Sequence, residues 1–275
     1  MNKYLMPPQD EWQVCCARSQ GNSHAATGQP CQDFVDTLCV PYGKRKIEPY
    51  SVVLAVADGA GSAERSHEGS QLAVDSALET ISQLWPKSRL PGTRKLKKVL
   101  ESAFASASES ISKKAEQDGT TTRQFATTLL IAIVVDNGVA VGQIGDGAIV
   151  TRTVGQEYDV LIAPQRGQYR NETSFVTDPG SSPVVMAKAK TTVDRIALFT
   201  DGLENLVIAQ ADGKPHSPFF DGLFRWIEMQ HGDHEAVSKG LKRLLDDPKT
   251  RSKTNDDLSL AVACRNVQAG EAKHQ

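Results

Sequence analysis

The sequence has neither a long hydrophobic run nor an excess of charge of one sign. Its longest apolar run, Phe125 to Val135, is about half of the roughly 20 residues that a membrane helix needs. The first eight residues contain no apolar core typical of a signal peptide. The 31 basic and 33 acidic side chains give a formal net charge of −2, which excludes bulk attraction to nucleic acid or acidic membranes. We therefore expect a cytoplasmic protein whose function lies in a local site.

Cysteine is also scarce. The five cysteines are an odd number and include no CxxC pair, so they offer neither a zinc spacing nor a redox spacing. Most of them lie in apolar stretches, which predicts buried, reduced thiols. A closed zinc site is excluded because the sequence has no cluster of histidine and cysteine.

The pattern of apolar residues predicts an α+β fold. Residues 66–85 and 94–117 each carry apolar side chains at steps of three and four, which indicates two helices. Further helices are expected at Phe219–Met229 and His234–Leu245. The expected strands are Trp12–Arg18, Phe34–Val40, Ser51–Ala57, Phe125–Val135, Val139–Ile144, Ala148–Thr153, Tyr158–Ile162, Arg195–Thr200 and Leu258–Cys264. We expect helices packed on an antiparallel sheet or sheet sandwich, in a single domain spanning residues 1–275, with a core at about 10–265 and a polar tail at 266–275. The polar stretch 164–182 is interpreted as a surface excursion.

Three aspartates stand at the ends of apolar strands. Asp58, Asp146 and Asp201 each follow such a strand and precede a glycine, and Asp256 opens the last one. Turn chemistry explains Asp-Gly pairs in general, because both residues favour tight turns. Carboxylates at rigid strand ends are also suitable ligands for hard divalent cations. The spacing alone leaves ordinary turns and a shared Mg²⁺ or Mn²⁺ site as alternatives.

Six short segments occur together in a recognisable order. They are Gln32-Asp33, Val56-Ala57-Asp58-Gly59-Ala60-Gly61, Phe125-Ala126-Thr127-Thr128, Gly145-Asp146-Gly147, Phe199-Thr200-Asp201-Gly202-Leu203 and Asp256-Asp257-Leu258-Ser259. With these segments, the chain resembles the metal-dependent serine/threonine protein phosphatases of the protein phosphatase 2C family. The resemblance covers about Gly21 to Cys264. It implies a four-layer α-β-β-α fold, in which two antiparallel sheets form a β-sandwich flanked by helix pairs.

The resemblance also implies a site with two Mn²⁺ or Mg²⁺ ions. By similarity, Asp58 would bridge the ions, the carbonyl of Gly59 would be a ligand, and Asp201 and Asp256 would complete the main set. Asp58, Asp201 and Asp256 would then act in catalysis through a metal-bound water. Asp146 would hold a third, weaker ion. The pair Thr127-Thr128 matches a buried strand and is assigned to packing.

Several positions depart from the usual family pattern. Gln32-Asp33 stands where Glu-Asp is usual, so Gln32 could ligate only through its amide oxygen and Asp33 would take a larger share. Ala60 stands where a histidine is usual, Gly28 where a phosphate-binding arginine is usual, and Asp257 where asparagine is common. This pattern resembles a divergent, bacterial-type branch of the family.

A cation is still needed to position a substrate phosphate. His24 and Arg18 lie upstream of the Gln32-Asp33 pair and are the candidates. The alternative interpretations are a turn histidine and a charge at a strand end. Arg65 and His67 are weaker candidates, since His67 is expected in the first turn of its helix.

Together these features predict a metal-dependent serine/threonine phosphatase that hydrolyses phosphoserine and phosphothreonine. Its partner would be a phosphorylated protein, the target of a serine/threonine kinase, and we expect a monomer that binds neither nucleic acid nor membrane. One alternative is an inactive phosphatase-like sensor or scaffold. Another is a metallophosphoesterase acting on nucleotides, but the sequence has no nucleotide-binding glycine loop. The basic run 94–98 is interpreted as the solvated face of a helix.

Overall fold

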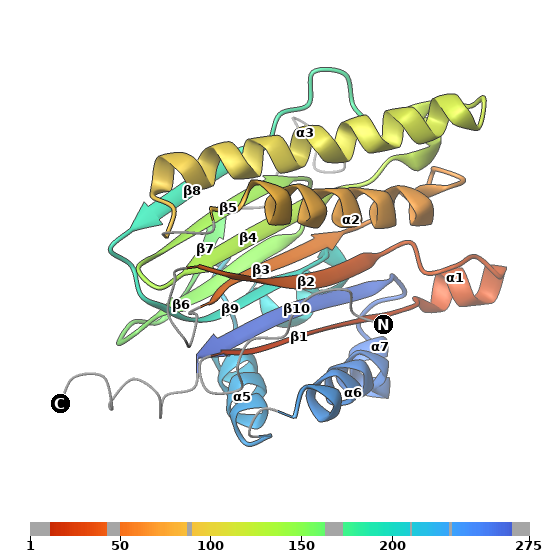
Figure 1. Ribbon diagram of the computed structural model, residues 1–275. Helices are drawn as coiled ribbons and strands as arrows, with labels where there is room; N and C mark the ends of the chain where they lie inside the picture. The colour runs from red at the N-terminus through yellow and green to blue at the C-terminus, as the bar shows by residue number, and fades with distance from the viewer. Residues whose placement is uncertain are drawn as a thin grey trace.

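Figure 1 shows the computed structural model of the chain, which describes residues 12–42, 50–86, 90–162, 173–209, 211–230 and 233–265. Two antiparallel five-stranded sheets pack face to face. The first sheet, called the β1 sheet, contains in spatial order β1 (Trp12–Ser19), β10 (Leu258–Arg265), β9 (Val193–Phe199), β6 (Ala148–Thr153) and β7 (Tyr158–Ile162). The second, called the β2 sheet, contains β2 (Phe34–Pro41), β3 (Tyr50–Ala57), β4 (Leu129–Val135), β5 (Gly138–Ile144) and β8 (Val184–Ala189).

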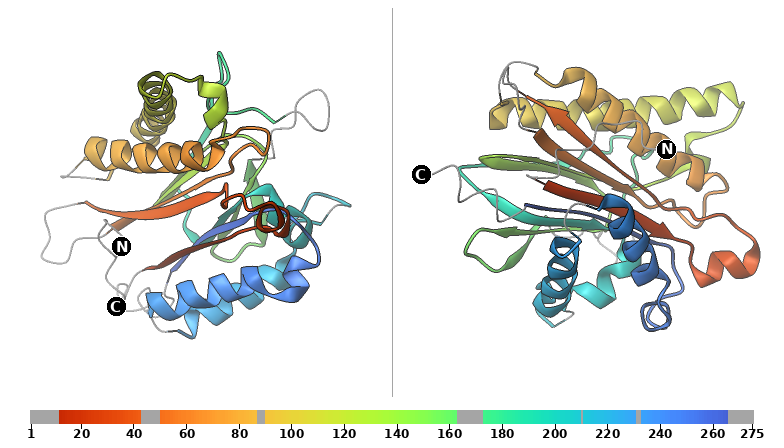
Figure 2. Two further views of the ribbon diagram at one scale, coloured as in Figure 1. Left: turned by 90° about the vertical axis from the view of Figure 1, so that its right-hand side faces the viewer. Right: turned by 60° about the horizontal axis from the view of Figure 1, so that its bottom comes forward.

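Helices cover the outer face of each sheet, as Figure 1 and Figure 2 show. The β2 sheet is covered by α2 (Ser66–Leu84) and α3 (Thr93–Gln117), and the β1 sheet by α5 (Ser217–Glu228) and α6 (His234–Asp246). The short elements are α1 (Asn22–Thr27), α4 (Glu204–Val207), α7 (Pro248–Arg251) and the 3₁₀ turns η1 (Thr122–Phe125) and η2 (Asp201–Leu203). The predicted four-layer α-β-β-α architecture is therefore confirmed.

Three apolar layers explain why this arrangement is stable. One lies between α2, α3 and the β2 sheet, the second lies between the two sheets, and the third lies between the β1 sheet and α5 and α6. Strands such as β4 are buried along their whole length because they contact apolar groups on both faces. That is why β4 has a continuous apolar sequence in place of the alternation expected of a strand with one wet face.

The strand register brings distant loops to one end of the sandwich. In the β2 sheet, Phe34 at the start of β2 pairs with Ala57 at the end of β3. In the β1 sheet, Phe199 at the end of β9 pairs with both Ala148 and Leu260, near the starts of β6 and β10. The segments that carry the strand-end aspartates therefore meet, although they are up to about 200 residues apart in the sequence.

Several elements differ from the sequence-based expectation. The strand expected from Phe125 begins at Leu129, because residues 122–125 form a 3₁₀ turn. The strand β8 follows the expected excursion 164–182 and was not predicted, and neither was α1. The helix α1 is short and largely exposed, and it has no apolar stripe. The strand β8 begins with a short apolar run, Val184 to Ala187, which periodicity alone cannot assign to a strand. Residues 164–172 of the excursion lie outside the described residues.

Across the described ranges, no helix combines the length and the apolar character needed to cross a lipid bilayer. All five cysteines lie within these ranges as free thiols, and Cys15, Cys39 and Cys264 are fully buried. Burial raises the pKa of each of these three thiols to about 12. The thiols are therefore protonated at neutral pH, and packing explains them without a nucleophilic role.

Candidate metal and phosphate site

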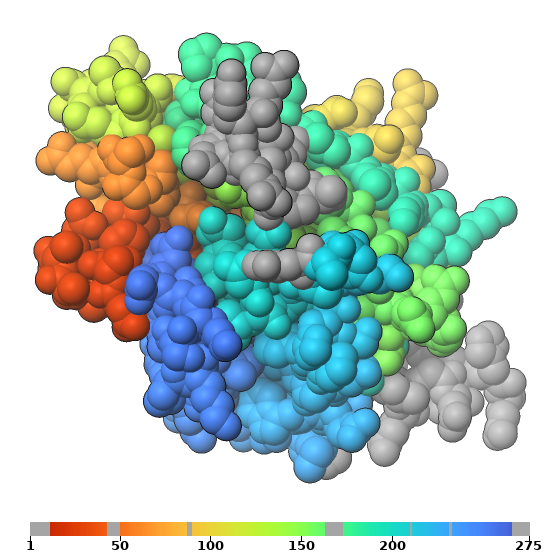
Figure 3. All heavy atoms as spheres, turned by 180° about the vertical axis from the view of Figure 1, so that it is seen from behind, coloured from red at the N-terminus to blue at the C-terminus, as the bar shows by residue number. Residues whose placement is uncertain are grey.

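Five carboxyl groups from both sheets converge at one end of the sandwich. Asp58 follows β3, Asp201 follows β9, Asp146 lies between β5 and β6, and Asp33 and Asp256 precede β2 and β10. The four others all lie close enough to raise the pKa of Asp58 by charge repulsion. Figure 3 shows this face, where the red α1 region, the blue segment before β10 and the teal segment after β9 lie together. The structure thus gathers all five aspartates singled out in the sequence.

The cluster is electrostatically unfavourable when all of its members are charged. Withdrawal from water and then neighbouring acids, first Asp33 and Asp201, raise the pKa of Asp58 well above its usual range. Burial, with repulsion from Asp257, raises the pKa of Asp33 to about 8. Burial, with repulsion from Asp146, raises that of Asp201 to about 6. Within the described residues, no lysine or arginine is among the main neighbours that shift these three groups.

The donor atoms at this end are suitable for a hard divalent cation. They are carboxylate, amide and carbonyl oxygens, the ligands that Mg²⁺ and Mn²⁺ prefer. The Oδ1 atom of Asp201 and the Oε1 atom of Gln32 are buried without a hydrogen-bond partner among the described residues. In the same ranges, no three or more His, Cys, Asp or Glu side chains are gathered tightly enough to hold a metal ion. The arrangement is therefore an acidic cluster with spare oxygen donors and not a closed coordination sphere.

The backbone of Asp58 is held from both sides by the threonine pair. The Asp58 N–H donates to Oγ1 of Thr128 at 2.9 Å, and Oγ1 of Thr127 donates to the Asp58 carbonyl at 2.9 Å. Both threonines are buried, in agreement with the structural role expected of them. Gly59 is required because a Cβ there would lie 2.8 Å from the Gln32 carbonyl oxygen. These contacts set the direction in which Asp58 leaves its strand.

The Gln32-Asp33 pair is fixed by neighbours from both sheets. The carbonyl of Gln32 accepts hydrogen bonds from the Gly59 N–H at 3.2 Å and from the Ser70 hydroxyl at 2.6 Å. The Asp33 carboxylate accepts one from the Thr200 hydroxyl at 2.8 Å. Asp33 is almost fully buried, and its contact with Thr200 places it beside the strand end that carries Asp201. Asp33 thus has a carboxylate within the cluster, while Gln32 contributes a neutral amide oxygen.

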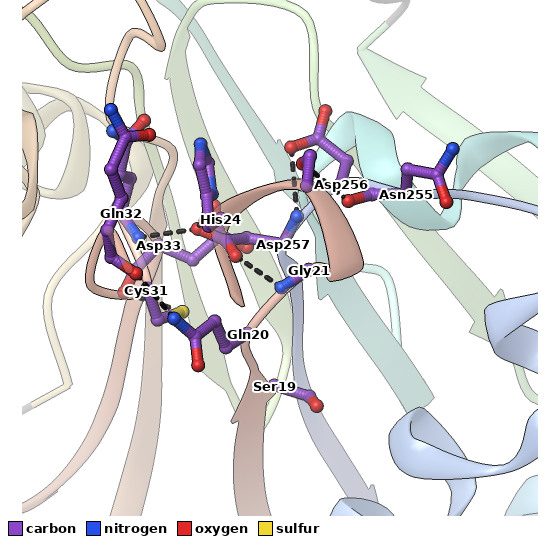
Figure 4. Close-up of polar contacts among 12 residues, drawn as sticks. Ser19, Gln20, Gly21, His24, Cys31, Gln32, Asp33, Asn255, Asp256 and Asp257 are labelled. Carbon is purple, nitrogen blue, oxygen red and sulfur yellow. Dashed lines mark hydrogen bonds and ion pairs between the residues drawn. The ribbon is translucent and has the colours of Figure 1, made fainter. Parts of the chain in front are cut away.

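The Asp257 carboxylate contacts three groups at this end of the molecule. The sequence analysis did not predict this role for Asp257. One of its oxygens accepts the Gly21 N–H and the other accepts the Gln32 N–H, each at 2.5 Å. Nδ1 of His24 lies 2.9 Å from the same carboxylate, and the His24 side chain is only 13% exposed. Figure 4 shows Asp257 between these three groups. His24, in α1, therefore lies at the site beside Asp257. In the sequence, Asp257 stood out only as a departure from the family pattern.

The two candidate cations differ in their surroundings. His24 is held by Asp257, as described above. Arg18 is an exposed residue of β1 that donates from Nη1 to the Asp33 carbonyl at 2.6 Å and stacks over the Phe34 ring. The weaker candidate Arg65 is engaged by the carboxylates of Glu68 and Asp118. His67 lies in the first turn of α2, as the sequence predicts.

Two positioning contacts were missed by sequence reasoning. Nη1 of Arg251, in α7, donates to the Asp256 carbonyl at 3.0 Å, and its other amino group binds the Ser19 hydroxyl. The Gln143 side chain donates to the carbonyls of Gly145 and Gly147, both at 2.9 Å, and so shapes the turn that carries Asp146. Arg251 thus acts on the backbone of Asp256, and Gln143 acts on the two glycines that flank Asp146. No pattern in the sequence indicates such a contact, because each depends on how a loop folds back.

Comparisons with known proteins agree with this geometry. Residues 20–246 match the family model described as protein phosphatase 2C. The chain is 31% identical over 259 residues to serine/threonine-protein phosphatase 3 of Escherichia coli K12, covering 92% of this chain and 98% of that protein. The fold is similar to Stp1 of Staphylococcus aureus, with a TM-score of 0.60 at 16% identity, covering 96% and 97% of the two chains. It is also similar to the catalytic domain of PstP in complex with two manganese ions, with a TM-score of 0.59 at 16% identity, covering 93% and 98%.

Proposed function

Since the chain belongs to the protein phosphatase 2C family and is a serine/threonine phosphoprotein phosphatase, we propose that it works with two divalent cations, Mn²⁺ or Mg²⁺, held by its acidic cluster. The observation that carries the proposal is the convergence of five aspartates, for three of which no arginine or lysine in the described part of the chain is among the main neighbours that shift the pKa. A protein gains no stability by gathering like charges away from water. A bound cation removes that repulsion, which gives the cluster a physical reason to exist.

Each ligand is assigned from its place in the cluster. Asp58, at its centre, would contact both ions, with Gly59 contributing its carbonyl. Asp201 and Asp256 would bind from the β1 sheet, Asp33 and Gln32 from the segment before β2, and Asp146 would hold a third ion. When bound, such ions lower the pKa of a water that attacks phosphorus and neutralise the phosphoryl oxygens. The chain itself fixes the carboxylates on strand ends, so little reorganisation is needed when charge develops.

His24 is proposed to bind the substrate phosphate. Nδ1 of His24 lies 2.9 Å from the Asp257 carboxylate, so this side of the ring faces an acid. An imidazolium carries a proton on both ring nitrogens, and in that form the opposite nitrogen would donate to a phosphate oxygen while Nδ1 faces Asp257. Arg18 is the second candidate, because its guanidinium has donors beyond the one that binds the Asp33 carbonyl. We expect His24→Ala to raise KM for a phosphopeptide about tenfold with the affinity for Mn²⁺ retained.

The proposal is tested by a metal titration. The purified full chain is treated with EDTA and then assayed with increasing Mn²⁺ or Mg²⁺ on phosphoserine, phosphothreonine and phosphotyrosine peptides, with Asp58→Asn as the control. We expect turnover of the first two peptides only when metal is present. Metal-independent turnover, or full activity in the Asp58→Asn protein, would contradict the metal site. Metal binding without any turnover would favour the phospho-sensor alternative.

A further inference from the structure

A groove outside the acidic cluster lies between α3 and the turn that leads into β8. Its volume is about 730 Å³. In Figure 1 the teal segment that leads into β8 passes α3 and rises above it. Both walls include short side chains, which leave the space open: Ala105, Ser108, Ser112, Gly180, Ser181 and Ser182. The α3 residues fall three, four and seven positions apart and so form one stripe of the helix.

The wall opposite α3 is a defined turn. Val176 is buried in the apolar layer under α3, and its N–H donates to the Thr127 carbonyl at 2.8 Å. The Asp178 side chain accepts the Phe175 N–H at 2.7 Å, and its carbonyl accepts the Ser181 N–H at 3.0 Å. The groove is therefore formed before a ligand binds, which reduces the entropic cost of binding.

The lining of the groove has an apolar floor and an acidic rim. Phe104, Ile144 and Val176 supply the floor. Glu101, Glu109 and Asp178 supply the rim, and no basic residue is among the described residues that line the groove. Glu109 also pairs with Lys113, but both side chains are more than 60% exposed, so this pair is weak. An apolar floor with an acidic rim suits a lysine or arginine, whose methylene stem is apolar and whose head is cationic.

The groove and the acidic cluster share two chain segments. Ile144, on the floor, lies two residues before Asp146 in the cluster. The Thr173 hydroxyl donates to the Asp146 carboxylate at 2.6 Å, and Thr173 lies three residues before Val176. At about 3.3 Å per residue in an extended chain, these connections span at most roughly 7 to 10 Å. A peptide whose phosphate reaches the cluster can therefore place a side chain a few positions away in the groove.

We propose that this groove binds a lysine or arginine that lies within a few residues of the phosphoserine or phosphothreonine in a protein substrate. This inference rests on the proposed function, since it assumes that the phosphate binds at the acidic cluster. It narrows the substrate class to phosphoproteins with a basic residue close to the phosphorylated one. Charge complementarity favours this occupant over an acidic peptide.

The test compares two phosphopeptides that differ only at flanking positions, one with arginine and one with norleucine on both sides of the phosphoserine. We expect kcat/KM for the arginine peptide to be about tenfold higher, through KM, because exposed ion pairs each contribute modestly. The preference should shrink in high salt, which screens exposed charges. The double variant Glu101→Gln, Glu109→Gln should reduce the ratio to about twofold. The charge-reversed Glu101→Lys, Glu109→Lys should bring it below one.

A matched control is Glu116→Gln, an exposed acid of the same helix outside the groove, which should leave the ratio unchanged. Ala105→Trp, at an exposed position, fills the groove without removing charge and should also lower the ratio. Equal kcat/KM for both peptides in the native protein, or a ratio that survives the double variant, would overturn the inference. Turnover of p-nitrophenyl phosphate by the native protein distinguishes failure of the groove proposal from failure of the proposed function. If metal-dependent turnover is present but the two peptides are not distinguished, only the groove proposal fails. If metal-dependent turnover is absent, the proposed function fails.

Discussion

Carboxylates in two regions of the molecule lie in opposite electrostatic surroundings. Between the start of α2 and the end of α3, Arg65 binds Glu68 and Asp118, and its hydrogen bond to Glu68 holds the pKa of that acid below its usual range. At the end of the sandwich, burial and mutual repulsion raise the pKa of Asp58 and Asp201. The first set favours the folded state, whereas the second opposes it as long as no cation is bound. The contrast indicates that the acidic cluster is kept for binding and not for stability.

The largest expected effect comes from removing the central acid of the cluster. Asp58→Asn should lower metal-dependent kcat/KM at least about a thousandfold, because several kcal/mol of charge stabilisation is lost with the cation. In the absence of metal the same variant should unfold at a higher temperature, because a buried like charge is gone. Phosphopeptide assays and calorimetry with EDTA measure the two effects.

The matched change in the paired region is Asp118→Asn. It removes an acid that Arg65 and Lys114 neutralise, so we expect a lower unfolding temperature and undiminished activity. If Asp58→Asn and Asp118→Asn changed the metal-free stability in the same direction, the contrast between the two regions would be wrong.

The next largest effect is the increase in the free energy of unfolding when Mn²⁺ is added. Mn²⁺ at about 100 times its dissociation constant should add roughly 2.7 kcal/mol to the free energy of unfolding by mass action. A thermal shift assay with and without Mn²⁺ measures it, and Asp201→Asn should reduce the shift. Equal shifts in the native protein and in this variant would remove Asp201 from the ligand set.

A third expectation concerns pH. Since the folded-state pKa values of Asp33 and Asp201 are raised to about 8 and about 6, the folded protein holds more protons than the unfolded chain between pH 4 and these values. The metal-free protein should therefore lose stability as pH rises through this window, by about 1.4 kcal/mol per pH unit for each proton that only the folded state holds. Saturating Mn²⁺ should flatten the profile, because the cation replaces the protons. Chemical denaturation from pH 4.5 to 8 tests this, and stability that rises with pH would contradict it.

The smallest of these effects concerns the loop before β10. Arg251→Met removes the donor to the Asp256 carbonyl, and we expect Mn²⁺ to bind about tenfold more weakly, as is usual for groups that orient a metal ligand. The control is Lys242→Met, since Lys242 binds Asp246 and Ser19 but not Asp256. Titration calorimetry with Mn²⁺ compares them. Equal losses in both variants would indicate a general loosening of this region and not a specific effect on Asp256.

Much of the fold could be predicted because its signals are local. The helices α2 and α3 show a continuous apolar stripe, and Asp58, Asp146 and Asp201 stand at the end of apolar strands followed by glycine. In contrast, β8 is an edge strand whose place is set by hydrogen bonds to β5 and by the packing of Val185, Met186 and Ala187 against the neighbouring apolar layers. Its apolar run, Val184 to Ala187, is too short to be assigned to a strand by periodicity alone.

For the site, too, some features follow from the sequence and others only from the tertiary structure. The amino-acid sequence by itself determined which oxygen donors the protein has and that each lies at the end of a strand. It also determined that no cysteine or zinc chemistry is available. Only the tertiary structure decided which acids are neutralised by arginine and which repel one another, because antiparallel register closes loops far apart in sequence onto one end of the sandwich. It likewise decided the roles of Asp257 and Arg251, whose partners are Gly21, Gln32 and Ser19. Such contacts depend on distances in space, which residue types and their spacing along the chain do not specify.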